Sequence, residues 1–64
     1  ETMTIDKIRH YLSPTIFDHW CSVNDIDTLT KAEAKLSREI ELGILNGVEF
    51  RAELKLLRMK IVDI

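Results

Sequence analysis

The sequence predicts an all-α fold in which two short helices precede a longer helical hairpin, with all 64 residues in one small domain. Three observations favour this fold. Only two glycines and one proline interrupt the chain, and good helix formers such as Leu, Ile, Glu, Lys and Ala are abundant. Apolar residues recur at helical spacing along most of the sequence. The pairs Ser13-Pro14 and Asn46-Gly47 carry the residue types that end and begin helices.

The region 4–22 is expected to form the two short helices. Thr4 can accept a hydrogen bond from a free backbone N–H and so cap a first helix that ends near residue 12. The residue before a proline avoids the α region, while the ring of Pro14 fits the first turn of a new helix. Ser13 is therefore expected to cap a second helix that ends near Ser22.

The region 27–64 is expected to form the hairpin, because one apolar seam repeats through it every seven residues. The seam consists of Ile26, Leu29, Leu36, Ile40, Phe50, Leu54, Leu57, Ile61 and Ile64. A third helix is predicted over residues 28–45 and a fourth over residues 48–62. Either Asp25 or Asp27 can accept hydrogen bonds from the free N–H groups at the start of the third helix.

The pair Asn46-Gly47 is predicted to break the hairpin. Either Gly47 ends the third helix in the left-handed conformation, or Asn46 caps the fourth, with Glu49 at capping-box spacing. A single unbroken helix is the alternative, since the seven-residue pattern continues across the glycines. Such a helix would be about 55 Å long, too long for a chain of this size to cover, so we expect a break. Gly43 is interpreted as a place where a bulky side chain such as Trp20 approaches the backbone.

A second apolar side of the hairpin predicts an interaction surface. It consists of Leu42, Leu45, Leu56 and Met59, which lie outside the seam. A helix that is apolar on two sides is sandwiched between neighbours. The first two helices can supply that cover, or a second copy can, and we expect a bundle completed by homodimerisation. Phe17 and Trp20 are further candidate interface residues because aromatic anchors dominate many interfaces, although filling the core is the simpler role for both.

Two basic stripes support an alternative function, a small dimeric DNA-binding regulator. The stripes are Lys31, Lys35 and Arg38, and Arg51, Lys55 and Arg58. In such a regulator they would face phosphate. The net charge of −2 and the alternation of bases with acids instead favour a salt-bridged, solvated face. In a helix-turn-helix with Gly47 in the turn, Glu53 would also occupy a position that requires a buried aliphatic residue.

No residue pattern indicates catalysis, a cofactor or a resident metal. His10, His19 and Cys21 are the only soft metal ligands, and they lack the close pairing of zinc sites. His19 and Cys21 are two residues apart and therefore lie on different sides of a helix, which is unsuitable for a nucleophile and its base. The single cysteine excludes a disulfide within the chain and is compatible with a reducing compartment.

The sequence therefore predicts a non-enzymatic helical protein that acts through protein–protein contact as a regulatory, adaptor or assembly subunit. We expect a homodimer, another protein partner, or both. No apolar run approaches the roughly 18 residues that a membrane span requires, and no signal peptide is visible, so a cytoplasmic location is expected. Met3 is a candidate natural start that follows Glu1 and Thr2.

Overall fold

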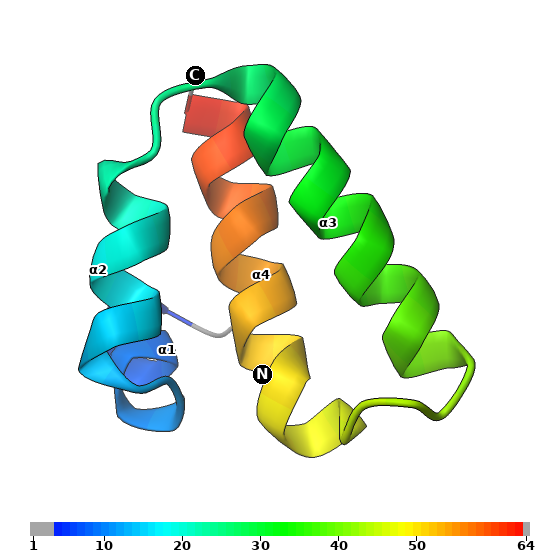
Figure 1. Cartoon of the computed structure of the whole chain (residues 1–64). Coiled ribbons are helices and arrows are strands. Elements are labelled where there is room, and N and C mark those ends of the chain that lie inside the picture. The colour runs from blue at the N-terminus through cyan, green and yellow to red at the C-terminus, as the bar shows by residue number, and fades with distance from the viewer. Residues whose placement is uncertain (1–3, 64) are drawn as a thin grey trace.

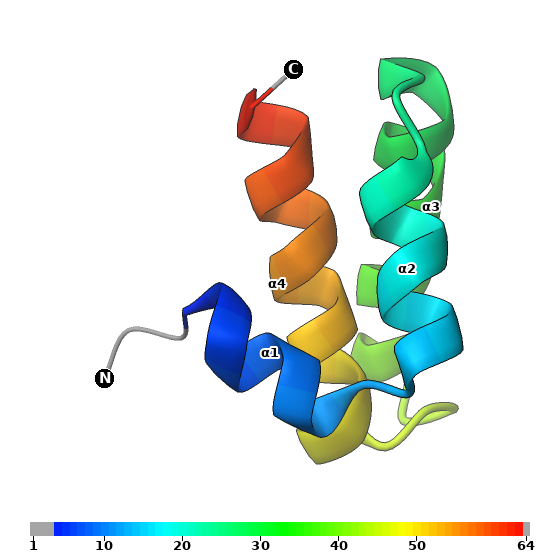
Figure 2. The same cartoon turned by 90° about the vertical axis from the view of Figure 1, so that its left-hand side faces the viewer.

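A computed structural model describes residues 4–63 and contains, within that range, four helices and no strand (Figure 1). The helices are α1 (Ile5–Tyr11), α2 (Pro14–Ser22), α3 (Ile26–Glu41) and α4 (Gly47–Asp63). The predicted all-α fold is confirmed. The central helix is α4, because each of the other three packs against it (Figures 1 and 2). The expectations for Met3 and Ile64 lie outside the described residues.

The first two helices begin where the sequence predicted, and each is capped by a side-chain hydroxyl. The Thr4 hydroxyl accepts a hydrogen bond from the backbone N–H of Lys7 at 3.4 Å. The Ser13 hydroxyl accepts one from the backbone N–H of Ile16 at 3.2 Å, and Pro14 is in the first turn of α2. The chain is extended at Leu12, which ends α1 after Tyr11, one residue earlier than predicted.

Asp25 caps α3 and uses both carboxylate oxygens. One accepts a hydrogen bond from the backbone N–H of Asp27 at 3.0 Å, and the other accepts one from the Thr28 hydroxyl at 2.9 Å. Of the two acids that the sequence offered for this position, Asp25 is the cap, and α3 begins two residues earlier than predicted. The Thr28 hydroxyl, followed by the Asp27 N–H, lowers the pKa of Asp25 below its ordinary value of 3.8.

This lowered pKa predicts an acid-sensitive contribution to stability. The ionised carboxylate stabilises the fold above the unfolded pKa of 3.8, and that stabilisation is lost as pH falls through the lower folded pKa. Asparagine caps helices about as well but does not titrate. The midpoint of urea unfolding, measured by circular dichroism, should fall as the pH is lowered below 3.8 in the wild type. We expect a smaller fall in Asp25→Asn. An equal fall in wild type and variant would contradict this role of the Asp25 carboxylate. The control is Asp18→Asn, which changes an exposed acid on α2.

The break between the long helices begins at Gly43 rather than at Gly47. Gly43 has a φ of +76°, and its N–H donates to the carbonyl of Ile40 at 3.1 Å. The N–H of Ile44 donates to the carbonyl of Glu39 at 3.0 Å. These two hydrogen bonds form the Schellman motif, which satisfies the free carbonyls at a helix end. The predicted extension of the third helix to residue 45 is therefore wrong, because α3 ends at Glu41.

Asn46 caps the start of α4, as one of the two interpretations of Asn46-Gly47 predicted. Its side-chain oxygen accepts a hydrogen bond from the N–H of Val48, and its carbonyl accepts one from Phe50, both at 2.9 Å. A left-handed Gly47 is wrong, since that glycine is the first residue of α4. The unbroken helix is also wrong, because the molecule is only 28 Å in its longest dimension. The proposed approach of a bulky side chain to Gly43 is wrong too, since a Cβ there would meet nothing within 4 Å.

The core consists of two clusters of buried residues on different sides of α4. The first joins α4 to α1 and α2 through Ile8, Leu12, Phe17, Ala52 and Leu56. The second joins it to α3 through Leu29, Leu36, Leu54 and Leu57. The two-sided apolar character of α4 therefore reflects helices of its own chain on both sides. None of the helices in residues 4–63 is long and apolar enough to span a membrane.

Candidate interaction surface

The structure separates the six residues that the sequence suggested for an interface. Phe17 and Leu56 are buried in the first cluster, and Met59 packs half-buried against it. Leu45 is half-buried against the second cluster, whereas Leu42 is 63% exposed in the α3–α4 turn. Phe17 and Leu56 thus already have neighbours within the chain. Whether any of the six contacts a partner stays a prediction.

Trp20 holds α2 against both clusters. Its ring is half-buried and packs against residues of each cluster. Its indole N–H donates a hydrogen bond of 2.6 Å to a carboxylate oxygen of Glu53 on α4. This bond satisfies the indole N–H, as a half-buried tryptophan requires. The contacts are those of a core residue, and they also give Glu53 a structural role that the sequence did not reveal.

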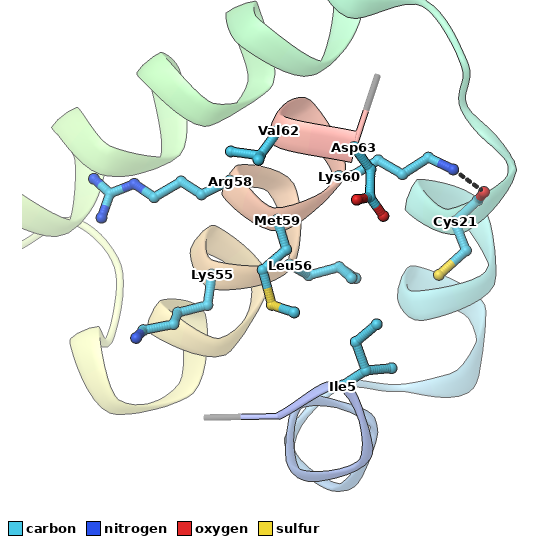
Figure 3. A pocket seen from close by; sticks show the side chains of 9 residues that line it. All are labelled: Ile5, Cys21, Lys55, Leu56, Arg58, Met59, Lys60, Val62 and Asp63. Atoms are coloured by element: carbon cyan, nitrogen blue, oxygen red, sulfur yellow. Dashed lines mark hydrogen bonds between the residues drawn. The ribbon is translucent and has the colours of Figure 1, made fainter. Parts of the chain in front are cut away.

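An open apolar hollow lies along the C-terminal half of α4. The short helix α1 crosses the N-terminal half of α4 and leaves its other half uncovered on that side (Figure 2). The hollow has a volume of about 610 Å³ (Figure 3). It is lined by Ile5, Cys21, Lys55, Leu56, Arg58, Met59, Lys60, Val62 and Asp63. Apolar side chains remain accessible here, since Ile5 is 47% and Val62 is 85% exposed.

The helical period of α4 explains which residues reach the hollow together. Residues three and four positions apart share one face of a helix. Around Met59, Leu56 and Val62 are three positions away, while Lys55 and Asp63 are four positions away. All five therefore fall on one face, which is apolar in the middle, basic at one end and acidic at the other. Ile5, at the start of α1, borders this face (Figure 3).

The other two cations of the hollow are engaged within the chain. The Arg58 Nε atom lies 2.9 Å from a carboxylate oxygen of Glu33 on α3. The Lys60 ammonium donates a hydrogen bond of 3.0 Å to the carbonyl of Cys21 at the end of α2 (Figure 3). Within residues 4–63, neither Lys55 nor Asp63 has a hydrogen-bonding or ion-pairing side-chain partner. The unmatched charges of the face are therefore one cation and one anion.

All six residues of the two basic stripes are exposed, as a solvated face requires. Arg51, Lys55 and Arg58 line a groove of about 250 Å³ between α3 and α4, together with Glu41. Lys35, from the α3 stripe, instead lines a separate hollow with Glu39, Glu53 and Trp20. Acidic residues thus accompany the cations in both places, and Arg58 is also paired with Glu33 on α3. The remaining residues of the α3 stripe are Lys31 and Arg38.

The soft metal ligands do not gather into a centre. Among the described residues, no three His, Cys, Asp or Glu side chains are close enough to hold a metal ion together. The ring of His19 packs edge-on against that of Trp20, with 4.7 Å between ring centroids. Cys21 is an exposed thiol at the edge of the hollow.

The comparisons with known proteins add no assignment to this geometry. The chain matches no family model, no curated protein and no solved structure. The candidate surface therefore depends on the contacts of this chain alone. Sequence reasoning found Leu56 and Met59 but missed Ile5, Val62 and Asp63. The spacing of Lys55, Met59 and Asp63 was visible in the sequence, but nothing there showed that this face of α4 is open.

Proposed function

We propose that this chain is a non-enzymatic protein–protein interaction module whose hollow receives an amphipathic α-helix of a partner. The observation that supports this proposal is the uncovered half of α4, on which Met59 and Val62 stay accessible above buried Leu56. Amphipathic helices bind such surfaces through anchors three and four residues apart. The partner helix would run along α4 and occupy the place beside α1 where the bundle lacks a neighbour (Figure 2).

The charges at the rim of the hollow favour a partner helix that binds in one direction over an apolar ligand that binds in any orientation. Lys55 and Asp63 are at opposite ends of the apolar face, so they can orient a helix that carries matching charges. An apolar centre with a polar rim is the usual anatomy of protein interfaces. Apolar side chains therefore make the contact, and the charges at the two ends set the direction in which the partner helix lies. A regulatory, adaptor or assembly role is consistent with this kind of contact.

Titration with designed helices tests the function whichever protein is the natural partner. We would use three stapled helical peptides that share one leucine stripe and differ only in acidic, basic or mixed flanking charges. The Met59 methyl signal should shift saturably with at least one peptide below about 1 mM, the range of weak specific binding. Val62→Ser should weaken binding, whereas Leu42→Ser should not, because Leu42 is exposed in the turn away from the hollow.

The proposal would be wrong if none of the three peptides shifted the methyl signal, or if scrambled peptides shifted it equally. A fluorescent duplex DNA in the same buffer tests the alternative of a DNA-binding regulator. Phosphate contacts weaken steeply as salt rises. We expect no change in anisotropy at low salt. Salt-dependent binding that Arg51→Glu removes would favour the DNA-binding alternative instead.

A further inference from the structure

We propose that the helix received by the hollow is α4 of a second copy, which lies antiparallel to the first across a two-fold axis near Met59. This inference rests on the proposed function, because it identifies the occupant of the same hollow. The apolar residues of the face are Leu56, Met59 and Val62, and its end charges are Lys55 and Asp63. Their order along α4 makes the face complementary to itself.

A two-fold contact requires that when residue i meets residue j, residue j also meets residue i. In an antiparallel pair centred on Met59, residues equally distant from the centre in opposite directions meet. Lys55 then faces Asp63 of the partner subunit, and Leu56 lies opposite Val62 of the partner subunit. Met59 packs on its own counterpart. Both charges are neutralised, and the exposed Val62 of each copy lies over the part of the hollow whose floor is the buried Leu56 of the other copy.

Internal contacts strengthen the argument from charge. Arg58 and Lys60 also border the hollow, yet they are held by Glu33 and by the carbonyl of Cys21. The face therefore does not act as a uniformly basic surface that would select a uniformly acidic helix. It presents Lys55 at one end and Asp63 at the other. A second α4 in the antiparallel direction supplies the opposite charge at both ends at once.

Charge reversal provides the test, since exposed Lys55 and Asp63 can be changed without disturbing the core. Lys55→Glu places two acids together at both ends of the dimer, and Asp63→Lys places two bases together there. We expect each variant to self-associate at least about tenfold more weakly than wild type, because attraction becomes repulsion twice. An equimolar mixture of the two should form a heterodimer of near wild-type affinity, since every contact is again between opposite charges.

Sedimentation equilibrium measures the self-association. Concentrations up to about 1 mM are needed, because a contact confined to one face of α4 belongs among weak, transient interfaces. Native mass spectrometry identifies the heterodimer, since the two variants differ in mass. The matched charge-reversal control is Lys31→Glu, which changes an exposed residue of α3 and should dimerise like the wild type. Circular dichroism verifies that each variant is helical.

Two results would overturn the inference: a wild-type chain that is monomeric over the whole range, or a mixture that associates no better than its components. The peptide titration separates this failure from failure of the proposed function. If the chain stays monomeric but a designed helix still shifts the Met59 signal, the hollow binds a different protein and only the second copy is excluded. If neither the chain nor any peptide binds, both proposals are wrong.

Discussion

Leu57→Ala is expected to cause the largest loss of folding stability among the substitutions that we propose for this chain. Leu57 is completely buried on α4, where it packs in the cluster shared with α3. Removing a buried leucine side chain costs about 2–5 kcal/mol, because transfer free energy is lost and a cavity remains. A domain of this length has a total stability of roughly 3–10 kcal/mol. One substitution can therefore remove a large fraction of the free energy that stabilises the fold.

Urea denaturation followed by circular dichroism at about 222 nm, where helix content is measured, would report this effect. Leu42→Ala is the matched control, since Leu42 is 63% exposed in the α3–α4 turn. Its substitution should change stability by no more than about 0.5 kcal/mol. Equal midpoints for the two variants would show that the buried position of Leu57 does not determine the stability of the chain.

Trp20→Ala is expected to have the second largest effect, about 3 kcal/mol, near the lower end for a large aromatic residue because the ring is only half-buried. Its ring packs against both core clusters, so the substitution weakens the attachment of α2 to α4 and opens space beside α3. Circular dichroism is again the measurement, because the variant lacks the only tryptophan of the chain. A loss of stability below about 0.5 kcal/mol, typical of a surface substitution, would exclude this role.

The hydrogen bond between Trp20 and Glu53 can be separated from the packing of the ring. Glu53→Gln keeps an oxygen acceptor for the indole N–H, whereas Glu53→Ala leaves that N–H without its partner. Hydrogen bonds to charged groups contribute about 1.5–3 kcal/mol, and the half-buried position favours the lower value for Glu53→Ala. The expected order of destabilisation is Trp20→Ala, then Glu53→Ala, then Glu53→Gln. Equal effects of the two Glu53 variants would mean that the acceptor oxygen contributes nothing.

The turn between α3 and α4 marks where sequence reasoning reached its limit. From the sequence we place the boundary at Gly47 as a terminator or Asn46 as a cap, and give Gly43 a different role. In the structure Gly43 ends α3 and Asn46 begins α4. Residues 42–46 then reverse the chain. This choice also lets Leu45, within that turn, pack half-buried against the α3–α4 cluster, a contact between segments that no local pattern specifies.

The sequence by itself determined the helices and most of their starts, because a cap is a hydrogen bond between residues two or three positions apart. Thr4, Ser13 and Asp25 each make such a bond. The sequence also determined that α4 is apolar on more than one side. Only the tertiary structure decided what covers those sides. The short α1 docks through Ile8 on one part of α4, and because it is too short to cover the rest, it leaves the hollow around Met59 open.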